Sequence, residues 1–175
     1  MTKIRTPKFQ ELIQRCIHAF RASQKGPEIN GADLHAPNLD EYLCVLQGSK
    51  LYLTGKVTGH PLLGERLIRT SMLIYISDDS QWARTLSRWY RLGSPLKIDI
   101  SRTFPDIDLE GFCPTVGVHG LGIPLRIARK VMANRPGELS EVALKNGLYD
   151  AAKHLRSVQE HWPPKKISAQ DIELY

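Results

Sequence analysis

The stretch WARTLSRWYRLG at residues 82–93 combines arginines with large aromatic side chains and contains no acidic residue. Arginine forms paired hydrogen bonds with phosphate, and tryptophan or tyrosine offers a ring on which a base can stack. This is the chemistry of a protein that binds single-stranded nucleic acid. The same residues also suit a hydrophobic core whose arginines extend their charged ends into solvent. We expect Trp89 to belong to such a core, with the arginines beside it exposed.

Most of the positive charge lies in two segments. The formal net charge is +6. Residues 82–102 hold five basic side chains against one acidic side chain, and residues 121–136 hold four against none. Clustered charge attracts an anionic partner better than dispersed charge, and two such segments on one face would neutralise about 4 to 6 phosphates. We therefore predict that nucleic acid, or an acidic protein surface, is bound by Arg84, Arg88, Arg91, Arg126, Arg129 and Lys130.

A triplet of carboxylates is the strongest candidate for enzymatic chemistry. Asp106, Asp108 and Glu110 alternate in DIDLE, so a strand would place them on one face, where they would suit a divalent metal ion. A polar edge strand or an acidic loop explains the same residues. Nuclease sites of the carboxylate-plus-lysine type also need a lysine two positions past an acid, and none follows here. We expect no catalytic residue, no metal ion and no cofactor.

A second route to nucleic acid is a helix-turn-helix near the C-terminus. Ala143 and Gly147 lie four positions apart, as a small residue and a turn glycine do in that motif. A recognition helix starting at Tyr149 would present Lys153 and Arg156. The alternative is a simple helical hairpin packed on the β module.

The N-terminal part predicts a helix followed by short strands. The helix starts near Pro7 and ends near Gly26, and its apolar stripe comprises Phe9, Leu12, Ile13, Cys16, Ile17 and Phe20. Residues 41–57 contain two β-like runs around a Gly-Ser turn, and residues 66–77 contain another. Residues 82–92 fit a strand or a helix, and we favour the strand. The predicted core of this module is Leu53, Val57, Ile68, Leu73 and Ile74.

The C-terminal part predicts helices. One helix covers residues 123–137 and ends at NRPG. Ser140 caps another, which either continues through KNGL or breaks there. The result is an α+β protein: an N-terminal helix, a small antiparallel β module (a sheet or an SH3-like barrel) and a helical C-terminal region. We expect residues 1–102 to hold the first two parts and residues 103–175 the third, packed together as one globular unit.

Three short motifs occur along residues 53–95. They are Gly-x-Val-x-Gly-His-Pro at residues 55–61, Thr-Ser at residues 70–71, and Trp-Ala-Arg-Thr-Leu-Ser-Arg-aromatic-Tyr-x-Leu-Gly at residues 82–93. This pattern resembles an uncharacterised family of small alphaproteobacterial proteins that are often encoded on plasmids and other mobile elements. The resemblance implies a bacterial, cytoplasmic protein with a small β module, and it implies no activity.

Composition places the chain among ordinary globular proteins. No run is apolar over the roughly 18 residues that a membrane span requires, and the N-terminus lacks the apolar stretch of a signal peptide. The three cysteines, Cys16, Cys44 and Cys113, are spaced as reduced thiols. We expect a cytoplasmic location and no membrane partner, and the oligomeric state stays open.

Three functional hypotheses follow from these observations. The first is a non-enzymatic accessory or regulatory protein that binds nucleic acid. The second is a protein-binding inhibitor or adaptor encoded by a mobile element. The third is a small metal-dependent hydrolase that uses the carboxylate triplet.

Overall fold

The computed structural model describes residues 7–97, 113–114 and 120–164. The chain forms two compact units, one of Met1–Lys25 with Ala133–Tyr175, and the other of Gly26–Met132. The sequence predicts a boundary at residue 102 instead. The observed division differs because the N-terminal helix contacts a C-terminal helix and is grouped with it.

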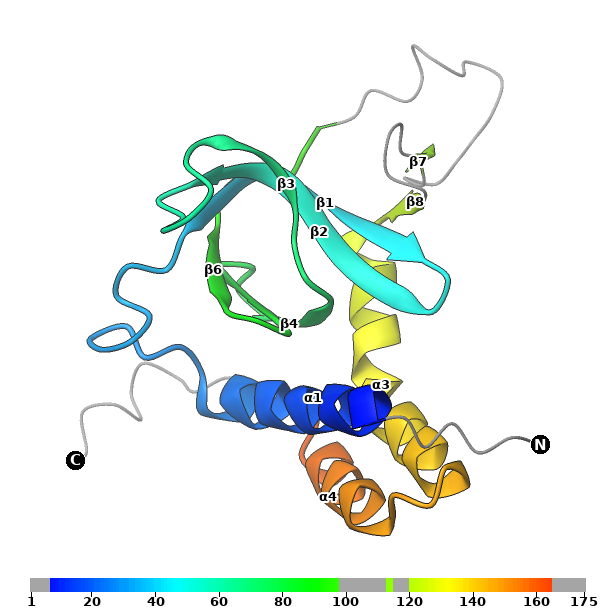
Figure 1. The fold of residues 1–175 in the computed structure, drawn as a ribbon. Coiled ribbons are helices and arrows are strands. Elements are labelled where there is room, and N and C mark those ends of the chain that lie inside the picture. The colour runs from blue at the N-terminus through cyan, green and yellow to red at the C-terminus, as the bar shows by residue number, and fades with distance from the viewer. Residues whose placement is uncertain (1–6, 98–112, 115–119, 165–175) are drawn as a thin grey trace. The chain divides into compact units, whose positions relative to one another are not determined.

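The second unit is built on a curved sheet. Its described strands follow the order β3-β2-β1-β6-β5-β4, while β8 pairs with β1 and β7 with β8. All neighbours are antiparallel except β1 and β6. Strand β2 also contacts β4, and Figure 1 shows the strands wrapping around a core. The bounds are β1 Asn38–Gln47, β2 Lys50–Thr58, β3 Arg66–Arg69, β4 Leu73–Ile76, β5 Trp82–Thr85, β6 Trp89–Leu92, β7 Cys113–Pro114 and β8 Leu121–Ile123.

Alternation along the strands produces the core of this unit. On β2, the residues Leu51, Leu53 and Val57 point inward and are buried, while Lys56 is exposed. Leu53, Val57 and Leu73 of the predicted core belong to one buried cluster, and Ile68 is partly buried against it. Ile74 is also buried but lies outside that cluster. The α+β prediction is also confirmed, with a sheet that is mixed and mostly antiparallel.

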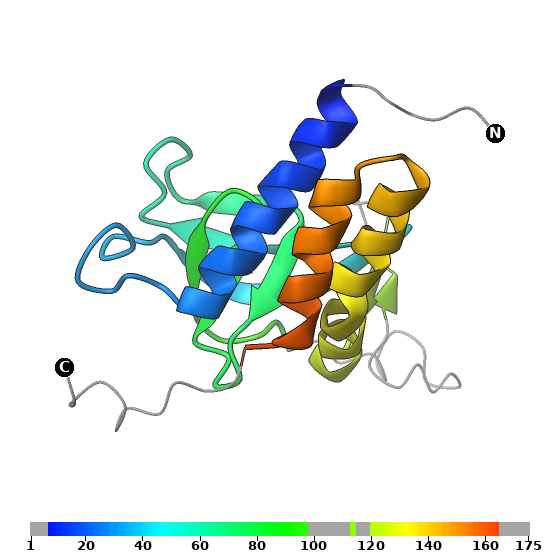
Figure 2. The ribbon, with the colours of Figure 1, turned by 90° about the horizontal axis from the view of Figure 1, so that it is seen from below.

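The first unit is helical. Helix α1 (Pro7–Lys25) ends before Gly26, whose φ of 79° is the left-handed conformation typical of a residue after a helix. Helix α1 contacts α4 (Tyr149–Glu160), and the two lie side by side in Figure 2. The rings of Phe20 and Trp162 meet edge to face at 5.0 Å. Most of the predicted stripe of α1 is buried, namely Ile13, Cys16, Ile17 and Phe20.

Helix α3 (Leu125–Lys145) continues through the predicted stop at NRPG, so the prediction of a helix end there is wrong. Pro136 interrupts the backbone hydrogen bonds of a helix. The side-chain amide of Gln159, from α4, replaces a lost backbone hydrogen bond next to this proline. Its Oε1 accepts a hydrogen bond from Gly137 N at 2.8 Å, and its Nε2 donates to Ala133 O at 3.2 Å. The amide thus satisfies two groups that are partners in a regular helix.

Helices α3 and α4 form an antiparallel hairpin. Near the turn, Leu148 N donates to Ala143 O, and farther along Ser140 Oγ donates to Ala152 O. Ser140 lies inside α3 and does not cap a third helix. The helices of a helix-turn-helix cross at about 90–120°. Contacts that extend from the turn to Gln159 therefore favour the helical hairpin over that motif.

Candidate nucleic-acid interface

The WARTLSRWYRLG stretch is a β-hairpin. Strands β5 and β6 pair in the register Trp82 with Arg91 and Arg84 with Trp89. In the turn, Thr85 N donates to Arg88 O at 2.9 Å, and the Thr85 hydroxyl donates to the same oxygen at 3.1 Å. The preference for strand over helix is confirmed, but the segment contains two strands in place of one.

The outer face of this hairpin, opposite the side that carries Ala83, Tyr90 and Leu92, holds a ladder of two arginine and two tryptophan side chains in the order Arg91, Trp82, Trp89, Arg84. The guanidinium carbon of Arg91 lies 4.9 Å from the centroid of the Trp82 ring. The rings of Trp82 and Trp89 meet at 6.4 Å with an interplanar angle of 88°. The guanidinium carbon of Arg84 lies 6.0 Å from the centroid of Trp89. Strand alternation places these four side chains together and turns Ala83, Tyr90 and Leu92 toward the core.

The two ends of the ladder differ in burial. Trp89 is buried, as expected, but Arg84 is buried too, with 8% of its surface exposed. The Arg84 Nε has no hydrogen-bond partner among the described residues, and burial lowers the pKa of its guanidinium while Asp33 raises it. The expectation that the arginines beside Trp89 are exposed is therefore wrong for Arg84. At the other end, Arg91 is exposed and Trp82 is partly buried.

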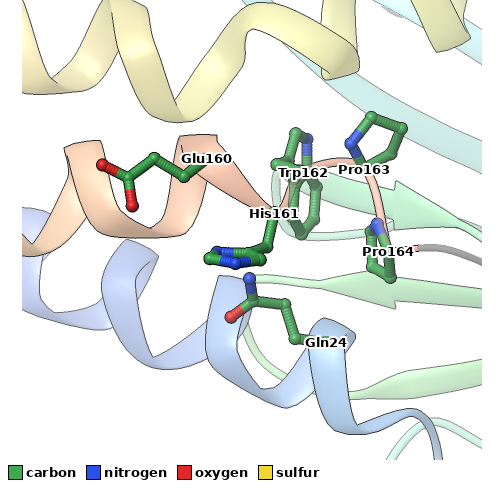
Figure 3. A pocket seen from close by; sticks show the side chains of 6 residues that line it. All are labelled: Gln24, Glu160, His161, Trp162, Pro163 and Pro164. Carbon is green, nitrogen blue, oxygen red and sulfur yellow. The ribbon is translucent and has the colours of Figure 1, made fainter.

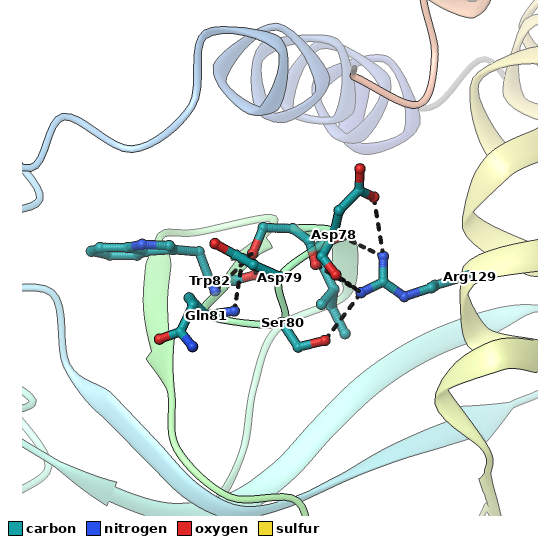
Figure 4. A network of polar contacts seen from close by, with 8 residues as sticks. Asp78, Asp79, Ser80, Gln81, Trp82 and Arg129 are labelled. Atoms are coloured by element: carbon teal, nitrogen blue, oxygen red, sulfur yellow. Dashed lines mark hydrogen bonds and ion pairs between the residues drawn. The ribbon is translucent and has the colours of Figure 1, made fainter. Parts of the chain in front are cut away.

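Arg129 is held by the turn between β4 and β5. Its Nη2 donates to Ser77 O at 2.7 Å, to Ser80 Oγ at 3.1 Å and to Asp78 O at 3.2 Å. Its Nη1 lies 3.4 Å from Ile76 O and from Asp78 Oδ1. Figure 4 shows the guanidinium inserted into this turn. Most of its donors are therefore used within the second unit.

The other two helical candidates, Arg126 and Lys130, are exposed near the start of α3. Arg129 of the same helix and Trp82 lie on opposite sides of the β4–β5 turn in Figure 4. The exposed carboxylates of Asp78 and Asp79 lie in that turn. The two basic segments thus approach the same turn, but its acidic side chains lie between them.

Hydroxyl groups gather at the β5–β6 turn, which the charge pattern did not reveal. The Ser71 and Ser87 hydroxyls lie 2.8 Å apart, and Ser87 N donates to Ser71 Oγ at 3.2 Å. Arg88 is partly buried at this turn. Burial and, after it, the positive charge of Arg88 lower the pKa of His60. The Thr-Ser motif and the Trp-Ala-Arg-Thr-Leu-Ser-Arg motif thus meet through Ser71 and Ser87, and the charge of Arg88 acts on His60 of the first motif.

A separate pocket of about 400 Å³ belongs to the first unit. In Figure 3, Gln24 of α1 lies beside His161, which follows α4. The pocket joins an indole and two proline rings to three polar side chains, and its lining is Gln24, Glu160, His161, Trp162, Pro163 and Pro164. The sequence did not predict a pocket there.

The carboxylate triplet Asp106, Asp108 and Glu110 lies outside the described residues. Within residues 7–97, 113–114 and 120–164, no group of three His, Cys, Asp or Glu side chains is placed to hold a metal ion. In the same part of the chain, no helix is long and apolar enough to cross a membrane.

Comparisons with known proteins identify a family for the chain. No curated protein and no solved structure matches it. A family model matches residues 5–103, which include α1 and the strands from β1 to β6. Because that match covers more than half of the 175 residues, the chain belongs to the Family of unknown function (DUF6634).

Proposed function

We propose that the protein binds single-stranded nucleic acid through the outer face of the β5–β6 hairpin, in a non-enzymatic accessory or regulatory role. One observation carries the proposal. The exposed guanidinium of Arg91 stacks on the partly buried ring of Trp82. Bases stack on aromatic rings and on guanidinium planes, and a guanidinium also pairs with phosphate. The pair therefore offers both contacts that a single strand requires.

Arg88 supplies a second phosphate contact in this proposal. Arg88 lies in the turn between β5 and β6, three residues before Arg91. The hydroxyls of Ser71 and Ser87 beside Arg88 are further hydrogen-bond partners for a phosphate. Arg126 and Lys130 are outer contacts beyond the acidic turn.

The burial of Arg84 and the contacts of Arg129 reduce the number of phosphates that the protein is expected to neutralise. Arg84 is buried and Arg129 is bound to the β4–β5 turn, so at most four of the six candidates contact the ligand. For single strands, each neutralised phosphate contributes about −0.7 to the slope of log K against log salt. The expected slope is therefore about −3.

Fluorescence anisotropy with a labelled single-stranded oligonucleotide at several salt concentrations tests this proposal. Arg91→Ala should weaken binding to all sequences and reduce the slope by about 0.7. Trp82→Leu should reduce the binding free energy by about 1–3 kcal/mol and leave the slope unchanged. Arg66→Ala is the matched control, because it removes the same charge from exposed strand β3 at the other end of the strand order. Absence of binding at low salt contradicts the proposal.

An acidic protein surface is the second candidate partner. Leu34 is 48% exposed, and its carbonyl oxygen lies 3.5 Å from Arg91 Nη2. An exposed apolar side chain beside an arginine is typical of protein interfaces. For a protein partner, Leu34→Ser should weaken binding of that protein and leave oligonucleotide affinity unchanged.

A further inference from the structure

Strand β3 has an open edge. It is the last strand in the described order and pairs with β2 alone. Just beyond β3, Thr70 N donates to Leu53 O at 2.8 Å and Leu53 N donates to Thr70 Oγ1 at 3.1 Å, so the N–H of Thr70 faces β2. Hydrogen-bonded and non-hydrogen-bonded pairs alternate in an antiparallel ladder. Leu67 and Arg69 therefore direct their backbone N–H and C=O groups away from β2, toward the open edge.

The side chains along this edge are apolar and charged. Leu67 is 72% exposed, and Leu62, in the loop before β3, is 83% exposed. Leu67 and Arg69 lie two positions apart on β3, so their side chains share the outer face, and Glu65 lies in the bend just before the strand. Arg69 is held at this face, because its Nη1 donates to Gln47 Oε1 at 2.9 Å and its guanidinium carbon lies 4.7 Å from the centroid of the Tyr52 ring.

We infer that two copies of this chain associate edge to edge through β3. Residues with outward-facing backbone groups must face one another in such an antiparallel pair. With Leu67 on the two-fold axis, it faces Leu67 of the partner subunit. The pairing of the two copies extends this strand by one residue into the bend before it, which sets Glu65 opposite Arg69 of the partner subunit, and the two-fold axis repeats this pairing at the other end.

Charge selects this register over its neighbours. Opposite charges at directly paired strand positions stabilise the pair, and like charges destabilise it. A shift by two residues sets Leu67 opposite Arg69 of the partner subunit and loses both charge pairs. Charged side chains, lysine above all, usually protect an exposed edge from pairing, whereas the signs here complement each other across a two-fold axis.

The interface is small, so the dimer is weak. Strand β3 spans only Arg66–Arg69, and interfaces below about 1,200 Å² are typical of transient complexes. We expect a monomer–dimer equilibrium that depends on protein concentration. The exposed leucines supply the apolar part of the contact.

Sedimentation equilibrium of the full chain over a concentration series tests the inference, without nucleic acid present. Leu67→Lys sets two ammonium groups together on the axis and should abolish the dimer. Because Leu67 is largely exposed, its replacement should leave thermal unfolding unchanged. The neighbouring exposed Arg66 provides the control variant Arg66→Ala, which keeps both charge pairs and should dimerise like the unmodified chain.

Charge reversal provides a sharper test. Glu65→Arg alone and Arg69→Glu alone each create like-charge pairs at both ends, and each should weaken the dimer about tenfold. Mixing these two variants should restore association, because Arg at 65 then faces Glu at 69 and Arg at 69 faces Glu at 65. A monomer at every concentration overturns the inference. So does a dimer that Leu67→Lys does not affect, or a mixture of folded charge variants that fails to associate.

Discussion

At the scale of single residues, neighbours of the same type have different roles. Arg84 and Arg91 lie on one face of the same hairpin, but Arg84 is buried and Arg91 is exposed. Arg129 and Lys130 are adjacent in α3, yet Arg129 binds the β4–β5 turn and Lys130 extends into solvent. Residue type shows which interactions a side chain can make, and its position in the fold selects among them.

The contacts of Arg129 predict that its substitution lowers the free energy of unfolding more than substitution of the adjacent Lys130 does. Arg129→Met keeps a long apolar stem but removes every donor to the turn, so carbonyl oxygens of Ser77 and Asp78 lose their charged partner. Hydrogen bonds to charged groups contribute about 1.5–3 kcal/mol, and we expect a loss of about 2 kcal/mol in the free energy of unfolding. Lys130→Met, the control, should change it by less than about 0.5 kcal/mol. Urea denaturation measures both, and equal effects contradict the assigned role.

The Cys44 thiol predicts a pH dependence of stability. Burial raises its pKa from 9.0 to about 12, although the charge of Arg129 lowers it. The folded state therefore keeps the thiol protonated at a pH where the unfolded chain loses the proton. Its contribution is fully present below pH 9 and falls by about 1.4 kcal/mol per pH unit as the pH rises toward 12.

Denaturation of the unmodified chain and of Cys44→Ala at pH 8, 9 and 10 checks this expectation. The unmodified chain should lose more stability between pH 9 and 10 than the variant does. Parallel curves would show that the thiol does not contribute. The raised pKa values of Tyr42, Tyr75 and Tyr90 act in the same direction, and burial is the largest cause for each. For Tyr42 the charge of Cys44 is a second cause, which Cys44→Ala also removes.

At the scale of elements, α3 depends on a side chain from α4. Proline and glycine at positions 136 and 137 are a helix-ending pair, but the helix continues to Lys145. The Gln159 amide occupies the gap in the backbone hydrogen bonds that this pair leaves. The helical hairpin is therefore stabilised by a contact between elements in addition to the buried faces of its helices.

Substitution of Gln159 should destabilise this hairpin in steps. Gln159→Ala leaves Gly137 N and Ala133 O without their side-chain partner, which should cost about 1–3 kcal/mol. Gln159→Glu keeps an acceptor for Gly137 N but provides no donor for Ala133 O, so its loss should be smaller. Thermal unfolding of the two variants measures the order. Gln159→Ala as stable as the unmodified chain would show that water replaces the amide at no cost.

At the scale of the whole molecule, the chain divides into two compact units. One unit joins the N-terminal helix to the C-terminal part of the chain, and the other contains the paired strands. Regions with separate contact networks open with different free energies. A local loss of stability should then remain largely within its own unit. This expectation can be measured on the intact chain.

Hydrogen exchange of Gln159→Ala tests that division. The variant should exchange faster than the unmodified chain at amides of α1, α4 and the second half of α3, which form one unit. Amides of β1 and β2, such as those of Leu53 and Val57, should change much less. A uniform increase across both groups would show that the chain unfolds as a single cooperative unit.

The sequence by itself determined the elements whose signals are local. Apolar spacing placed the helix from Pro7 to Lys25, the Gly-Ser turn placed the hairpin of β1 and β2, and KNGL placed the break between α3 and α4. These features depend on residues within a few positions of one another. The core residues Leu53 and Val57 also followed from alternation along a strand.

Only the tertiary structure decided features whose partners are distant in the sequence. The continuation of α3 through Pro136 depends on Gln159, 22 positions beyond Gly137. The role of Arg129 depends on Ser77, 52 positions earlier. Pairing of β5 with β6 set Arg84 over Trp89 and Arg91 over Trp82. In each case the sequence showed a group that can bind, and folding determined the partner, because distance in space and burial depend on the whole chain.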